Sequence, residues 1–169
     1  MDFLDEAITK LSLTPKRAEE LADGLSEIQL SWRAVPESFS VRENILHLRD
    51  IDVEGYEQRI RLILSEDNPM LPDVDGRKLA RERDYNKQPV QPALEDLRRS
   101  RAVSIEKLKN CSAQDLQRKA EMQGVGIIDL RRLLELWVEH DGGHIADLVE
   151  LRKAIETGSG PCFVQHQAA

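Results

Sequence analysis

The chain has 169 residues, with 24 Lys or Arg against 31 Asp or Glu and a net charge of −7. This length suits one domain with a sizeable core, and the acidic balance without a basic block argues against nucleic acid as a partner. No apolar run approaches the roughly 20 residues that cross a bilayer, and the acidic start is not typical of a signal peptide, so we expect a soluble, cytoplasmic protein.

The first half of the chain predicts two long helices, because apolar residues recur there every three to four positions. One helix is expected over residues 14–28, with Thr14 as its N-cap and Pro15 at its first position, after a short helix at the start of the chain. Ser40 and Glu43 form a capping box that predicts a second helix, ending near residue 64.

The second half predicts two more helices after a long loop. The stretch Glu66–Gln91 has prolines and no sustained period, so we expect a loop with at most one helical turn. A third helix follows Pro92, and Asp129 caps a fourth. The pattern predicts an all-α, up-down four-helix bundle over residues 1–156, with the long loop between helices 2 and 3 and a tail at 157–169.

Two of the four histidines, His140 and His144, lie four residues apart on the apolar stripe of the fourth predicted helix. A helix brings such positions onto one face, so both imidazoles can reach the same point. His47 lies at the edge of the second helix's apolar face and could add a third ligand, although periodicity alone does not place it there. Three histidines leave a coordination position open, as in catalytic zinc sites. The alternative is a set of core imidazoles hydrogen-bonded to carbonyl or carboxylate groups.

Two glycines separate the paired histidines in the sequence HDGGH. Gly142 and Gly143 would each cost about 1 kcal/mol relative to Ala inside a helix. They leave room for a ligand or for another helix, or else they mark a kink or a loosely packed helix. HDGGH also has the histidine spacing of the HExxH motif of zinc proteases, with Asp141 in the glutamate position, but no third ligand of those families follows His144.

Further residues carry a resemblance to a known family: Trp32, Pro36, Phe39-Ser40 opening a helix with Ile45-Leu46-His47-Leu48, and Leu133-Leu134 followed by HDGGH. Over about residues 10–155 the chain resembles the DinB/YfiT-like superfamily of metal-binding four-helix bundles. The resemblance implies that His47, His140 and His144 bind a divalent metal such as zinc or nickel. It also implies a small-molecule substrate and either metal-dependent hydrolysis or transfer of a thiol such as bacillithiol or mycothiol. Many members have a histidine where this chain has Gly143.

A metal held by three neutral imidazoles keeps its full charge, so it can activate water for hydrolysis or hold a thiolate for S-transfer. Asp50, Asp141 and Asp147 lie within one turn of a histidine, and we consider Asp50 and Asp141 candidates for orienting an imidazole or accepting a proton. The contrary expectation is that such carboxylates are solvated surface groups. A second class of function is a non-catalytic bundle, for which a homodimer is one option, whose metal or histidine network only ties the second and fourth helices together. Imidazole ligands alone do not identify the metal.

Overall fold

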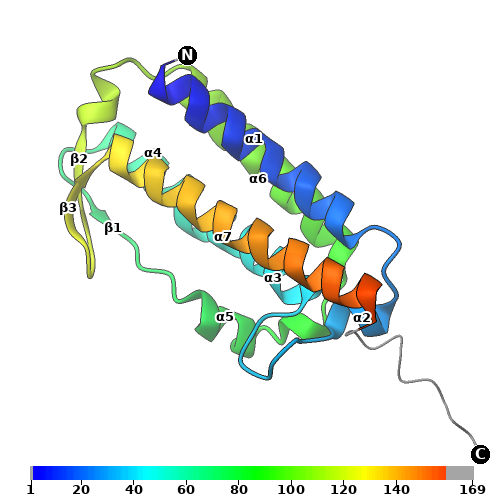
Figure 1. Ribbon diagram of the computed structural model, residues 1–169. Helices are drawn as coiled ribbons and strands as arrows, with labels where there is room; N and C mark the ends of the chain where they lie inside the picture. Colours follow the sequence, from blue (N-terminus) through cyan, green and yellow to red (C-terminus); the bar gives the residue numbers. More distant parts are fainter. Residues whose placement is uncertain (1, 159–169) are drawn as a thin grey trace, which may run out of the picture.

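The computed structural model describes residues 2–158, most of which form four long helices (Figure 1). The first, third and fourth helices are α1 (Phe3–Ala22), α6 (Val90–Lys109) and α7 (Leu130–Thr157). The second is a continuous rod made of α3 (Val41–Asp50), the π-helical turn η1 (Ile51–Tyr56) and α4 (Glu57–Ser65). The predicted four-helix bundle is therefore confirmed. The predicted tail lies, from residue 159 onward, outside the described residues.

Short elements connect the long helices: α2 (Glu27–Ser31), β1 (Met70–Leu71), α5 (Gly76–Glu82), η2 (Tyr85–Lys87), η3 (Asp115–Gln117), β2 (Lys119–Met122) and β3 (Gly126–Asp129). The sequence did not predict the small sheet, in which β1 pairs parallel to β2 and β2 pairs antiparallel to β3. Its strands have two to four residues, too few for alternation to be recognised. The predicted long loop likewise contains β1, α5 and η2.

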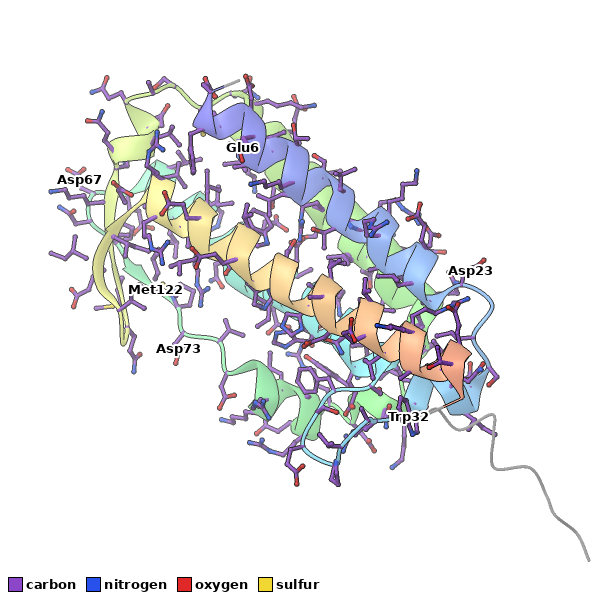
Figure 2. The ribbon with its side chains drawn as sticks, viewed as in Figure 1. Glu6, Asp23, Trp32, Asp67, Asp73 and Met122 are labelled. Carbon is purple, nitrogen blue, oxygen red and sulfur yellow. The ribbon has the colours of Figure 1, made fainter. Side chains whose placement is uncertain are left out.

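The ion pairs between helices reveal how the bundle is connected. Asp52 pairs with Arg101 at 2.8 Å and Glu57 pairs with Lys107 at 3.5 Å, so the second and third helices run in the same direction. The helix directions therefore do not alternate throughout, as they would in a simple up-down bundle. Residues 66–89, here called the crossing segment, must therefore return along the length of the bundle. Figures 1 and 2 show this path from the sheet towards α5. Helices α1 and α3 each pack against α6 and α7, which places α1 and α3 diagonally.

The break predicted before Pro15 does not occur, because α1 begins with Asp2 as its N-cap and continues through both Thr14 and Pro15. Proline lacks an N–H, so it leaves the carbonyl four residues earlier without its helical partner. Here the Leu11 carbonyl accepts a hydrogen bond from Arg101 Nη1 at 2.6 Å. A contact from another helix thus satisfies the group that the local pattern leaves unpaired.

The first helix also ends before the predicted residue 28. Gly24 adopts a φ of 71°, in the left-handed region that favours glycine. Ser26 and Gln29 then form a capping box that starts α2 as a separate helix. The prediction of a capping box for the second long helix is confirmed, since the Glu43 backbone N–H donates to Ser40 Oγ and Glu43 Oε2 accepts from the Ser40 N–H.

A layer of polar side chains separates two apolar clusters along the bundle. One cluster lies near α2 and α5 and includes Ile45, Leu94 and Leu148. The other lies nearer the sheet and includes Ile60 and Trp137. Between them every bundle helix contributes polar residues: Thr14, His47, Asp52, Ser100, Arg101, His140, Asp141 and His144. Within residues 2–158, no helix is long and apolar enough to span a membrane.

Candidate metal centre

Three histidines from two helices meet in the polar layer: His47 from α3, and His140 and His144 from α7. One nitrogen of each ring lies within 4.8 Å of the corresponding nitrogens of the other two, and His47 Nε2 is 3.0 Å from His140 Nε2. Nitrogens that bind one tetrahedral zinc at roughly 2.0–2.1 Å lie about 3.3 Å apart. The cluster therefore has the dimensions of a site for a single metal ion.

The two histidines of α7 are oriented by partners on their outer nitrogens. His144 Nδ1 donates to Asn44 Oδ1 at 2.7 Å, and the Asn44 amide is itself fixed because its Nδ2 donates to the Ser40 carbonyl at 3.0 Å. His140 Nδ1 lies 3.3 Å from Asp141 Oδ1, to which it can donate. Both contacts leave the Nε2 lone pair free. This is how histidine ligands are usually held, with the outer N–H donated to a carbonyl or carboxylate oxygen.

His47 is held differently, by close packing against the crossing segment. A Cβ at Gly76 would lie 2.2 Å from His47 Cε1 and 2.5 Å from Nδ1, so only glycine fits there. The buried Nδ1 has no hydrogen-bond partner among the described residues. The 3.0 Å contact between His47 Nε2 and His140 Nε2 requires a proton on one of them, because two lone pairs would repel. A shared cation would remove that requirement, so these residues fit a metal ion.

Burial also keeps His47 and His144 uncharged. Burial, together with the neighbouring histidines, lowers the pKa of His47 to about 2, and burial and His140 lower that of His144 to about 4. Both rings are therefore neutral near pH 7, as metal ligation requires. Burial would raise the pKa of Asp141, but its ion pair with Arg101 and its contact with His140 lower that pKa below its ordinary value. Asp141 is thus a carboxylate and accepts hydrogen bonds.

A pocket of about 650 Å³ opens beside the histidines. Its lining residues come from α3, α7, the start of α5 and the segment before α3: Ala34, Ser38, Phe39, His47, Arg77, His144, Asp147, Glu150, Leu151 and Ala154. The Phe39 ring stacks on His144, with ring centroids 6.3 Å apart, and lies 5.4 Å from His47. This volume is typical of small-molecule sites. The two nearest histidines therefore face a space that a substrate could enter.

The two carboxylates predicted to assist the histidines have different surroundings. Asp141 lies at His140 and is buried. The structure does not bring Asp50 to the cluster, because Asp50 faces the crossing segment, where it accepts from Arg83 at 2.6 Å and from the Tyr85 hydroxyl. Asp50 follows His47 by three residues on α3, and at this position it faces η2 instead of the pocket. Asp147, also considered, lines the pocket.

The structure does not use Gly142 and Gly143 to make room for a ligand beside the histidines or to kink the helix. Both are exposed, and a Cβ at either would have no atom within 4 Å. Helix α7 continues unbroken through them. Neither lines the pocket beside the histidines. Gly142 lines a smaller cavity of about 230 Å³ between α1 and α7, but no atom of α1 lies within 4 Å of its Cβ position.

Three residues of the site were not found from the sequence. Asn44 precedes His47 by about one turn on the same buried face, a spacing that could have indicated a partner for a ligand. Arg101 takes the place of an apolar residue on the buried stripe of α6, between Leu97 and Ile105, which is also a recognisable signal. Gly76 gives no such signal, since its role depends on where the crossing segment lies.

Comparisons with known proteins agree with this geometry. The DinB superfamily model matches residues 10–148. A protein of Halalkalibacterium halodurans named "Putative metal-dependent hydrolase" is 28% identical over 141 residues, which is 83% of this chain and 81% of that protein. A protein of Oceanobacillus iheyensis with the same description is 24% identical over 151 residues, which is 89% of this chain and 87% of that protein.

One solved structure has the same fold. YfiT from Bacillus subtilis, described as "a probable metal-dependent hydrolase with an unusual four-helix bundle topology", superposes with a TM-score of 0.84. The alignment covers 90% of this chain and 87% of YfiT at 23% identity, a level that establishes the fold alone. The family match spans most of the chain and includes all three histidines. The chain therefore belongs to the DinB superfamily.

Proposed function

We propose that this protein is a metal-dependent enzyme that binds one divalent ion, zinc or nickel, through His47, His140 and His144. The observation that carries the proposal is the convergence of three imidazole nitrogens within 4.8 Å beside a pocket of about 650 Å³. A structural zinc site is normally closed by four protein ligands. No fourth His, Cys, Asp or Glu of residues 2–158 joins this group, so a position stays available for water or substrate.

The proposed reaction is hydrolysis of a small molecule, which the descriptions of the two bacterial relatives support. When bound, the ion would supply a Lewis acid and lower the pKa of a coordinated water to about 7. Asn44 and Asp141 hold the ligand rings, and Phe39 covers the cluster on the pocket side.

The pocket also offers charged groups to a substrate. Arg77 extends over the Phe39 ring, with its guanidinium carbon 5.9 Å from the ring centre, and could hold an anionic group. Asp147 and Glu150 line the pocket along α7, and neither has an ion-pair partner among the described residues. Asp147, about one turn after His144, is placed to accept a proton from a bound substrate.

The second candidate reaction is transfer of a low-molecular-weight thiol such as bacillithiol or mycothiol. The size of the pocket favours it, because about 650 Å³ can hold a thiol beside an electrophile. The same three histidines would hold the ion for thiol transfer, and the ion would then supply the positive charge that lowers the pKa of a thiol bound to it. The choice between the two reactions therefore depends on which molecule enters the pocket.

The test is elemental analysis of the purified protein and of a His140→Ala, His144→Ala double variant, before and after reconstitution with zinc and nickel. Glu139→Ala is a matched control, because Glu139 is an exposed residue beside His140 on the same helix. We expect about one metal per chain in the wild type and in the control, and none in the double variant. Absence of metal from all three after reconstitution would overturn the proposal.

Activity assays on the loaded protein then compare ester and amide hydrolysis with thiol transfer to an electrophile, using bacillithiol and mycothiol. Turnover that disappears in the double variant identifies the reaction. Stoichiometric metal with no exchangeable water by NMR relaxation would instead assign the ion a structural role.

A further inference from the structure

Arg101 lies in the polar layer and contacts every long helix of the bundle. Its Nη1 donates to the Leu11 carbonyl of α1 at 2.6 Å, and its Nε donates to Asp52 Oδ1 of η1 at 2.9 Å. Its Nη1 also lies 2.7 Å from Asp141 Oδ2 of α7. The guanidinium lies over the Trp137 ring, 4.5 Å from its centre. Arg101 is only 2% exposed, and a charge so deeply buried needs paired partners such as these.

Helix α1 is adapted to this arginine. Pro15 deprives the Leu11 carbonyl of its helical hydrogen bond, which leaves that oxygen free to accept from Arg101. The buried Thr14 side chain also lies close to Asp141. Consecutive residues of α1 therefore support both ends of the contact between Arg101 and Asp141.

The two oxygens of Asp141 face different partners. Oδ2 pairs with Arg101 and Oδ1 lies 3.3 Å from His140 Nδ1. A carboxylate held at one oxygen cannot turn freely, so the guanidinium fixes the direction in which the other oxygen accepts. With Nδ1–H directed at Asp141, the Nε2 lone pair of His140 points towards His47, 3.0 Å away.

We propose that Arg101 is a positioning residue of the histidine cluster: through Asp141 it holds the His140 ring in the tautomer and orientation that a metal ligand requires. The part of this inference that concerns metal affinity rests on the proposed function. The contrary view is that Arg101 only stabilises the bundle by joining its helices.

Asp52 separates these two roles. It is the other carboxylate of Arg101 and is equally buried, but it lies in η1 and is not in contact with any of the three histidines. Asp52→Asn should therefore weaken the bundle while leaving the contact between Arg101 and Asp141 in place. Arg101→Met removes both contacts.

The experiment compares the wild type, Arg101→Met, Arg101→Lys and Asp52→Asn. Urea unfolding gives the stability of each, and absorption titration with Co²⁺ gives its dissociation constant. We expect the dissociation constant to rise about 10- to 100-fold in Arg101→Met, which is typical of losing a residue that orients a ligand. Asp52→Asn should lose stability and keep an affinity close to the wild type. The dissociation constant of Arg101→Lys should lie between those of the wild type and Arg101→Met, because one ammonium group cannot reproduce the paired donors of a guanidinium.

A second readout does not require metal. Long-range ¹H–¹⁵N NMR of the metal-free protein, with ¹⁵N-labelled histidine, identifies the nitrogen of His140 that carries the proton. The wild type and Asp52→Asn should show His140 protonated at Nδ1, and Arg101→Met a mixture of tautomers. Should Arg101→Met fail to fold, Arg101→Lys is compared with Asp52→Asn in the same way.

The outcomes distinguish this inference from the proposed function. Wild-type protein that binds no Co²⁺ would overturn the proposed function, while the tautomer comparison would still decide the role of Arg101. If the wild type binds Co²⁺ but affinity and tautomer change equally in Arg101→Met and Asp52→Asn, or in neither, Arg101 has no positioning role.

Discussion

His47 and Asp50 lie three residues apart on α3 and are both buried, yet their surroundings differ. Asp50 has a complete set of partners: Arg49, Arg83 and Tyr85 surround its carboxylate. His47 has an unpaired Nδ1 among the described residues and directs Nε2 at another histidine beside a pocket. A buried polar group with all its partners stabilises a fold, whereas one with an incomplete set marks a place where a ligand can bind.

The crossing segment serves both residues. Its Arg83 and Tyr85 close over Asp50, and its Gly76 closes against the edge of the His47 ring. The Asp50 contacts hold the segment at residues 83–85, whereas the His47 contact lies seven residues earlier, at Gly76. The Asp50 cluster should therefore control stability, and the His47 cluster should control metal binding.

The largest expected effect is that of Asp50→Ala. It leaves the Tyr85 hydroxyl and the arginines without their shared acceptor, and we expect a loss of about 3–5 kcal/mol in the free energy of unfolding. Metal content per folded chain should not change. Urea unfolding and elemental analysis measure the two quantities. Asp96→Ala is the control, since Asp96 is a more exposed partner of Arg49, at 3.9 Å, and should change stability little. Loss of metal in Asp50→Ala without loss of stability would reverse the assignment.

Acid should destabilise the metal-free protein through its histidines. His47 and His144 have pKa values lowered to about 2 and about 4, whereas an unfolded histidine has a pKa near 6.5. Below pH 6.5 the unfolded chain therefore takes up protons that the folded protein does not, and stability falls. Between pH 6.5 and pH 5 each ring should account for a loss of about 2 kcal/mol.

Urea unfolding at pH 7.5 and pH 5 in the presence of a chelator measures this loss, and His47→Asn isolates the contribution of one ring. The variant should lose less stability on acidification than the wild type, by about 2 kcal/mol. Equal losses in the two proteins would show that His47 is not buried as a neutral ring.

Gly76→Ala tests the packing against His47 directly. The new Cβ would lie 2.2 Å from His47 Cε1, so the ring or the crossing segment must move, and we expect a loss of about 1–3 kcal/mol. Metal affinity should fall as well, because the displaced ring is one of the three proposed ligands. Gly55→Ala is the matched control, since its Cβ would meet Ile51 Cγ2 at an ordinary 3.5 Å. Co²⁺ titration of both variants decides the point, and equal affinities would exclude a positioning role for Gly76.

The sequence predicted those features that depend on local pattern. Four apolar stripes predicted the bundle, and the spacing of His140 and His144 predicted a pair of metal ligands, which the structure brings together with His47. His47 needed the family resemblance, because its place at the edge of an apolar face did not reveal whether it was buried; the structure leaves it 8% exposed. Features that depend on distant contacts were missed. Pro15 indicated a helix start, because its sequence neighbours do not reveal that Arg101 bonds to the carbonyl that the proline leaves unpaired. Asp50 and Asp141 were equivalent by spacing alone.

The smallest expected effect concerns Gly142 and Gly143, where the sequence left several interpretations open. Both occupy open space on an unbroken helix, so nothing in the packing compensates for their conformational freedom. Gly142→Ala and Gly143→Ala should therefore each stabilise the protein by about 0.5–1 kcal/mol without changing metal content. Thermal unfolding and elemental analysis of the two variants measure this. If Gly143→Ala alone lost metal, the small residue next to His144 would be needed to leave space for the imidazole to move. The expectation that alanine is tolerated at this position of α7 would then be wrong.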